Sequence, residues 1–200
     1  KKLKENSANL YSAPVRAIWP SGKKRILSQT DTMRDHDCIF EGAGQGCSYV
    51  FDSKICIGLK AAKKVIDNEK LIVKSHDWVT YIVCRAYDYK WYFDKDFVSL
   101  DYMQHDQNDL GAKGTFNSYI GRFGLIINGW YKRQIQMYSF IYLKLMKERR
   151  QDSNLKKYIS NFSRPYYSRV IFNTIFVLRN GRRYFLHRFY LSILSIMNLI

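Results

Sequence analysis

The chain has 200 residues, 46% of them hydrophobic and 16% aromatic, and a formal net charge of +16. This composition excludes a disordered chain and is sufficient for a buried core, so we expect one folded domain with some extension. The charge requires an anionic partner, which leaves nucleic acid, an acidic membrane surface and phosphorylated substrates open.

The opening of the chain and its cysteines indicate a reducing compartment. Lys1 is not a methionine and no signal-peptide region follows it, so we expect a cut through a longer protein. The four cysteines, Cys38, Cys47, Cys56 and Cys84, form no CxxC pair, which predicts free thiols and argues against a zinc site.

A membrane-spanning helix is not expected, because no segment reaches about 18 uninterrupted apolar residues. The most apolar region is interrupted by Arg179, Arg182, Arg183, His187 and Arg188.

The first part of the chain alternates strand and helix patterns. The predicted elements are a strand over 10–19, a return strand over 23–27, a glycine-rich loop over 40–47, a short strand over 48–51, helices over 53–69 and 75–86, short strands within 89–100 and a loop over 101–115. The rest is helical by pattern, over 124–149, 153–161, 165–179 and 182–199. We therefore expect an α/β part over residues 1–115 and a helical extension over 116–200.

Three polar clusters stand where elements begin or end, which is where α/β enzymes assemble their sites. They are the loop from Glu41 to Cys47, the helix start Ser75-His76-Asp77-Trp78, and the run from Tyr102 to Asn108. The loop matches neither GxGxxG nor the P-loop, so taken alone it is typical of a tight turn.

Asp77 has two interpretations. A carboxylate in the first turn of a helix is favoured by the helix dipole, so capping explains Asp77 when it is taken alone. Alternatively, it is a general base that accepts a proton from a sugar hydroxyl. His76 and Trp78 flank it, and Trp78 offers an apolar face of the kind on which sugar rings stack.

Together the clusters resemble the second half of the bacterial family 2 glycosyltransferases of the rhamnosyltransferase-like type. That family has a G-x-G-C segment, an H-D-W helix start and a Y-R-Q-H-x-x-N-x-x-G-A loop. Here they correspond to the runs that begin at Phe40, at His76 and at Tyr102, in the same order and spacing over residues 38–115.

The resemblance implies a partial GT-A-type α/β fold and an inverting transfer from a nucleotide sugar to a glycan or lipid-linked acceptor in bacterial surface polysaccharide synthesis. Asp77 carries over as the catalytic base. The acceptor-site candidates are Gln45, Gly46, His76 and Trp78, and the candidates near the donor diphosphate or the acceptor are Gln104, His105 and Asn108. A divalent metal, Mn or Mg, is also implied, with D-x-D ligands mostly outside this chain.

The sequence departs from the family pattern in two ways. Met103 stands where the family has Arg, which removes a cation that could face phosphate. The runs Asp35-His36-Asp37 and Asp94-Lys95-Asp96 have the letters of D-x-D but the wrong place and order, so we interpret them as coincidence. The donor-binding half is expected upstream of Lys1, and the isolated chain is expected to be inactive.

The C-terminal helices interleave basic and aromatic residues, which suits an interfacial position on anionic lipid. The alternative is that the aromatic side chains pack on the α/β part while the arginines are solvated. The arginines are Arg164, Arg169, Arg179, Arg182, Arg183 and Arg188, and the aromatic residues are Tyr166, Tyr167, Phe172, Phe176, Tyr184, Phe185, Phe189 and Tyr190.

Two functions of other classes stay open. A basic nucleic-acid-binding module would use the charge and the aromatic residues, but no recognised binding motif is present, so nucleic acid is not favoured. The second open function is that of a non-catalytic remnant that binds a protein partner. The expected location is the cytoplasm, with peripheral contact to the inner face of the plasma membrane.

Overall fold

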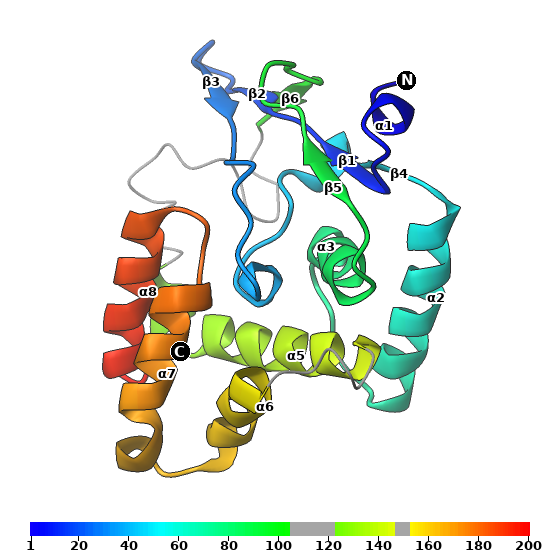
Figure 1. The fold of residues 1–200 in the computed structure, drawn as a ribbon. Helices are drawn as coiled ribbons and strands as arrows, with labels where there is room; N and C mark the ends of the chain where they lie inside the picture. The colour runs from blue at the N-terminus through cyan, green and yellow to red at the C-terminus, as the bar shows by residue number, and fades with distance from the viewer. Residues whose placement is uncertain (105–122, 147–152) are drawn as a thin grey trace.

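The computed structural model describes residues 1–104, 123–146 and 153–200, and within them the chain is a mixed α/β structure with two small sheets and several helices. The two sheets lie above α3 (His76–Ala86), which lies above α5 (Trp130–Leu145) (Figure 1). This architecture is compatible with a partial glycosyltransferase domain.

The strand predicted over 10–19 is split into β1 (Leu10–Ser12) and β2 (Val15–Ile18), which belong to different sheets. Pro14 lies between them, and a proline has no N–H to donate to a ladder. In one sheet β1 pairs antiparallel with β4 (Val50–Phe51) and parallel with β5 (Trp91–Phe93).

In the second sheet β2 forms the predicted hairpin with β3 (Lys24–Leu27) and pairs in parallel with β6 (Asp101–Met103). The hairpin turn includes Gly22 at a φ of 78°, a left-handed conformation that favours glycine. The prediction of a loop from residue 101 was wrong for Asp101–Met103, because pairing with β2 overrides the polar local pattern.

Most of the helices lie where apolar spacing predicts them. In chain order the helices include α1 (Lys2–Glu5), α2 (Ser53–Asn68), α3, α5, α6 (Ser153–Ser160), α7 (Tyr166–Asn180) and α8 (Phe185–Ile196), with 3₁₀ turns η1 (Asp37–Ile39), η2 (Gly46–Ser48) and η4 (Asn161–Ser163). Of these, α1 and the 3₁₀ turns were not among the predicted elements, and α5 is shorter than the helix predicted over 124–149. None of the helices in the described ranges is long and apolar enough to cross a bilayer.

One buried cluster joins the α/β part to the later helices. Tyr81 of α3 and Tyr138 of α5 are fully buried, and α5 packs against both α2 and α3. The division predicted at residue 115 falls outside the described residues. The elements that carry Asp77 are therefore supported from below by α5.

Candidate active site

Asp77 lies in the first turn of α3, as predicted. Its Oδ1 accepts two hydrogen bonds, one from the Ser75 hydroxyl and one from the Trp78 backbone N–H at 2.9 Å. Ser75 is the N-cap by position, but its hydroxyl contacts Asp77 rather than a backbone N–H of the helix. Among the described residues none donates a hydrogen bond to Oδ2, so this oxygen is available to accept a proton.

The glycine-rich loop packs directly against Asp77. A Cβ added to Gly46 would lie 2.5 Å from the Asp77 Cβ and 3.1 Å from its Oδ2, so only glycine allows this approach. The carbonyl of Gln45 accepts bonds from the backbone N–H and the hydroxyl of Ser48, which close the turn η2. The structure thus brings Gly46 of the first cluster to Asp77 of the second, while Gln45 precedes it at the start of η2.

The loop is also fixed to the end of β1. The Ser12 hydroxyl donates to the Ala43 carbonyl at 2.7 Å and accepts a bond from the Trp91 indole N–H at 2.8 Å. The carboxyl end of a strand that pairs in parallel with β5 therefore positions the loop, which is where α/β sites are commonly built.

The two neighbours of Asp77 differ in their environment. His76 is exposed, and only its carbonyl takes part in the helix start, accepting from the Thr80 hydroxyl. Trp78 is half-buried: its indole N–H donates to the Cys38 carbonyl at 2.6 Å, and its ring centroid lies 4.3 Å from that of Tyr138. Because Tyr138 covers part of the indole, contact between Trp78 and a sugar ring stays a prediction.

Tyr49 and Tyr138 near Asp77 were not singled out from the sequence, and Cys47 was noted only as a free thiol and as the end of the glycine-rich loop. Burial, and after it the Asp77 carboxylate, raises the pKa of the Tyr49 and Tyr138 hydroxyls. Burial also raises the pKa of the Cys47 thiol, which a backbone hydrogen bond lowers and Asp77 raises further. Tyr138 belongs to α5, more than sixty positions later in the chain, at an apolar-stripe position that predicts only a core role. The backbone of Ser75, at the start of α3, acts in the opposite direction and lowers the pKa of Tyr138.

The third cluster is only partly described. Gln104 is buried at the end of β6, where its backbone N–H donates to the Ile18 carbonyl at 2.8 Å. It therefore belongs to the second sheet, whereas Asp77 begins α3. His105 and Asn108 lie outside the described residues, so their predicted roles stay predictions.

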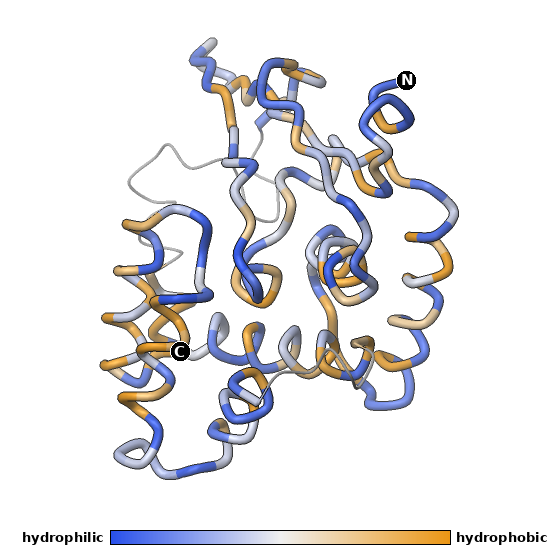
Figure 2. Tube along the Cα trace, in the orientation of Figure 1, coloured by the Kyte–Doolittle hydropathy of each residue, from blue (hydrophilic) through white to orange (hydrophobic). Residues whose placement is uncertain are grey.

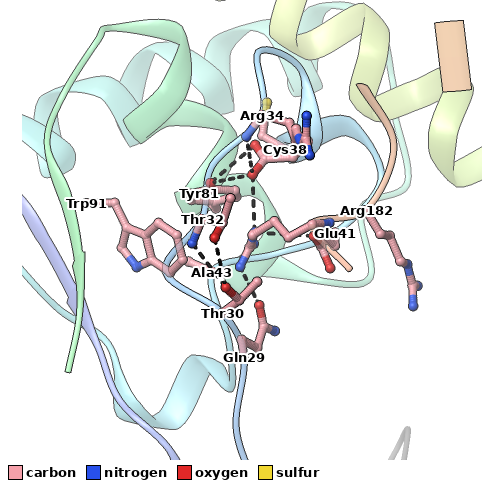
Figure 3. Close-up of polar contacts among 12 residues, drawn as sticks. Gln29, Thr30, Thr32, Arg34, Cys38, Glu41, Ala43, Tyr81, Trp91 and Arg182 are labelled. Carbon is pink, nitrogen blue, oxygen red and sulfur yellow. Dashed lines mark hydrogen bonds and ion pairs between the residues drawn. The ribbon is translucent and has the colours of Figure 1, made fainter. Parts of the chain in front are cut away.

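A second carboxylate, Asp37, forms ion pairs with Arg85 and Arg183. Figure 3 shows Tyr81, Glu41 and Gln29, which belong to the same polar network. The Oδ1 of Asp37 accepts from Arg85 at 2.9 Å, its Oδ2 accepts from the Arg183 Nε at 3.1 Å, and the Tyr81 hydroxyl lies 3.2 and 3.1 Å from the two oxygens. Asp37 is completely buried, and Arg183 lies 4.6 Å above the Trp91 ring.

This network ties the connection between α7 and α8 to the glycine-rich loop. Arg183 donates from its backbone N–H to Glu41 at 2.5 Å and from its guanidinium to the Gly42 carbonyl, and its Nε lies 3.2 Å from the Glu41 carboxylate. Burial raises the pKa of Glu41, although Arg183 and Arg182 act in the opposite direction. Arg183 therefore supports the loop that approaches Asp77.

The described residues do not fit a divalent metal. No group of three or more His, Cys, Asp or Glu side chains within them lies close enough to hold an ion. The two runs with D-x-D letters also have other partners. Asp37 is paired with two arginines, and buried Asp94 accepts a hydrogen bond from the Tyr11 hydroxyl at 3.2 Å. A surface hollow of about 560 Å³ lies elsewhere, between residues 33–36 and the ends of α6 and α7.

One comparison with known proteins bears on this site. The chain is 36% identical over 132 residues to dTDP-rhamnosyl transferase RfbG of Shigella flexneri, a match that covers 65% of this chain and 45% of that protein. The match supports a glycosyltransferase relationship and spans less than half the length of the relative. No protein-family model matches the chain, and no solved structure matches it.

Proposed function

We propose that this chain is the acceptor-side part of an inverting, family 2-like glycosyltransferase with a GT-A-type fold. The enzyme would move a sugar, in the manner of a hexosyl- or rhamnosyltransferase, from a nucleotide donor to a glycan or lipid-linked acceptor in bacterial surface polysaccharide synthesis. The observation that carries the proposal is the arrangement around Asp77, supported by the similarity to RfbG.

In the proposed step the Oδ2 of Asp77 accepts the proton of an acceptor hydroxyl. The hydroxyl oxygen then forms a bond to the anomeric carbon, the bond from that carbon to the diphosphate breaks, and the diphosphate leaves with the electron pair. Ser75 and the Trp78 N–H hold Oδ1, so the carboxylate keeps one orientation. Gln45, Gly46, His76 and Trp78 are the proposed acceptor contacts.

Donor binding is proposed to involve residues beyond those described, because the RfbG match spans only 45% of that protein. His105 and Asn108, with Gln104, are the proposed donor-side residues of this chain. The Mn or Mg ion that the family resemblance implies would assist departure of the diphosphate, and no step above depends on its position.

The test is transfer by the full-length protein with a panel of nucleotide sugars, with Mg or Mn present. Asp77→Asn keeps the size of the side chain and removes the base, so we expect turnover to fall about 100-fold or more with little change in acceptor affinity. Asp96→Asn is the matched control, since Asp96 is an exposed carboxylate in a run with D-x-D letters. It should keep full turnover.

Two outcomes would contradict the proposal. Unchanged turnover in Asp77→Asn would remove Asp77 from the mechanism while leaving the class of enzyme intact. Absence of transfer by the full-length protein with every donor, together with binding to nucleic acid or a protein partner, would favour a binding module instead.

A further inference from the structure

The hairpin of α7 and α8 carries its apolar side chains outward. Along α7 the exposed residues Tyr167, Ile171, Ile175 and Leu178 follow a spacing of three to four, which puts them on one helix face. Along α8 the exposed residues are Leu186, Phe189, Tyr190, Ile193 and Ile196. The two helices pack side by side at one edge of the molecule (Figure 1), and hydrophobic positions recur along both (Figure 2).

The inner faces of the same helices mix apolar and polar side chains. The buried residues of α7 are Arg169, Asn173, Phe176 and Val177, and those of α8 are Arg188, Leu191, Ser192, Leu194 and Ser195. Arg169 donates to the Asn198 side chain at 2.7 Å, and Asn161 donates to Asn173 at 2.9 Å. The hairpin therefore packs on the protein core through one face and leaves a second apolar face uncovered.

Neither interpretation made from the sequence describes this arrangement fully. Arg169, Arg183 and Arg188 are buried rather than solvated, and most of the aromatic residues are exposed rather than packed on the α/β part. Apolar side chains exposed along the outer faces of both helices suit surroundings that are lipid. At about 1.5 Å per residue, 15 and 12 residues are too short for a bilayer core of about 30 Å. The helices therefore suit a position in the interface between the bilayer and water rather than across its core.

The positive charge of the hairpin indicates which kind of membrane surface it would bind. From Ser153 to Ile200 the sequence contains two lysines and six arginines and no Asp or Glu. The exposed cations here are Lys156, Lys157, Arg164 and Arg179. A segment with apolar side chains outward and only positive charge complements an anionic bilayer surface, and it does not offer the acidic residues with which a second basic copy would pair.

We propose that the outer face of the α7 and α8 hairpin binds the surface of an anionic membrane, with the exposed apolar side chains inserted among the lipid headgroups. This surface is independent of the Asp77 step and would stand if the proposed chemistry failed. It would hold the protein where a lipid-linked acceptor is presented.

The experiment is sedimentation of the 200-residue chain with phosphatidylcholine vesicles, with and without about 30% phosphatidylglycerol, the anionic fraction being set high enough for surface attraction. We expect binding to the anionic vesicles only, weakened by salt. The double variant Ile171→Glu/Leu186→Glu should bind at least about tenfold less, because it puts charge on two inserted positions.

A matched control separates a local effect from a change in net charge. Ile57→Glu/Ile72→Glu alters two isoleucines that are 65% and 79% exposed outside the hairpin, against 74% and 75% for Ile171 and Leu186. It should bind as the unchanged chain does, and circular dichroism should show both variants folded.

Three results would overturn the proposal. These are no binding to anionic vesicles, an equal loss in both double variants, or equal binding to neutral vesicles, which removes the anionic requirement. A dimer in light scattering that the hairpin variant converts to a monomer, without vesicle binding, would assign the face to a second copy of the chain.

Discussion

Asp37 and Asp77 both follow a histidine in the sequence, yet the structure gives them opposite environments. Asp37 is completely buried, and each of its oxygens accepts from an arginine. Asp77 is half-buried, and only one of its oxygens is held by donors among the described residues. A carboxylate whose two oxygens both pair with arginines suits a structural role, whereas one with a fixed orientation and one oxygen without a described donor fits the proposed role of general base.

The strongest test of this contrast is stability. Asp37→Asn removes the carboxylate shared by partly buried Arg85 and buried Arg183, and breaking a buried pair costs roughly 3–5 kcal/mol. Asp77→Asn should change the free energy of unfolding by less than about 1 kcal/mol, since no cation in the described part of the chain pairs with it. Urea denaturation of both variants measures the difference, and equal losses would mean that Asp77 is structural as well.

The second prediction concerns how the hairpin supports the loop. Arg183→Met removes the side-chain contacts to Asp37, Glu41 and the Gly42 carbonyl and keeps the backbone bond to Glu41, and we expect a loss of about 3 kcal/mol. It should also lower turnover of the full-length enzyme at temperatures where the variant is folded, because residues 41–46 lose their anchor.

Leu194→Ala is the matched control for Arg183→Met. Leu194 is buried in α8, and its truncation costs a similar amount by leaving a cavity, about 2–5 kcal/mol. Leu194 takes part in none of the contacts that join Arg183 to Asp37, Glu41 and Gly42, so the folded variant should keep its turnover. A parallel loss of turnover would show that general destabilisation, and not the loop anchor, is responsible.

Local pattern predicted the helices well because their apolar spacing survives in the folded chain. α2, α3, α6, α7 and α8 begin and end within a few residues of their predicted bounds. The short strands were harder, since β6 exists through its pairing with β2 rather than through its own composition.

The helix start was predicted because its residues are neighbours in sequence, and Asp77 is in the first turn of α3 as expected. The close approach of Gly46, about thirty positions earlier, is a tertiary contact. Tyr138 and Arg183 were not assigned to the site, because they come from α5 and from the connection after α7. Only tertiary packing brings them there, and a buried arginine is indistinguishable in sequence from a solvated one.

The third prediction sharpens the Asp77 side of the contrast. Gly46→Ala adds a methyl group that would lie 2.5 Å from the Asp77 Cβ, so the loop or the carboxylate must shift. We expect turnover to fall about 10- to 100-fold, as small misplacements of catalytic groups do. Gly124→Ala, where an added Cβ meets nothing within 4 Å, should be neutral. Unchanged kinetics for Gly46→Ala would mean that the loop does not position the base.

The smallest effect concerns Asp94, a third carboxylate that is buried but accepts from a tyrosine. Burial, and after it Asp94, raises the pKa of Tyr11 to about 12. An unfolded tyrosine titrates near 10, so above that pH the unfolded state loses its proton first and the folded state becomes less stable as the pH rises. From pH 10 to 11 this loss of stability amounts to roughly 1 kcal/mol.

Tyr11→Phe should therefore flatten the decline in unfolding free energy over this window, whereas exposed Tyr167→Phe should not. Urea denaturation at half-unit steps of pH measures both slopes, and a decline in Tyr11→Phe as steep as in the unchanged chain would show that burial and the contact with Asp94 do not hold the Tyr11 proton.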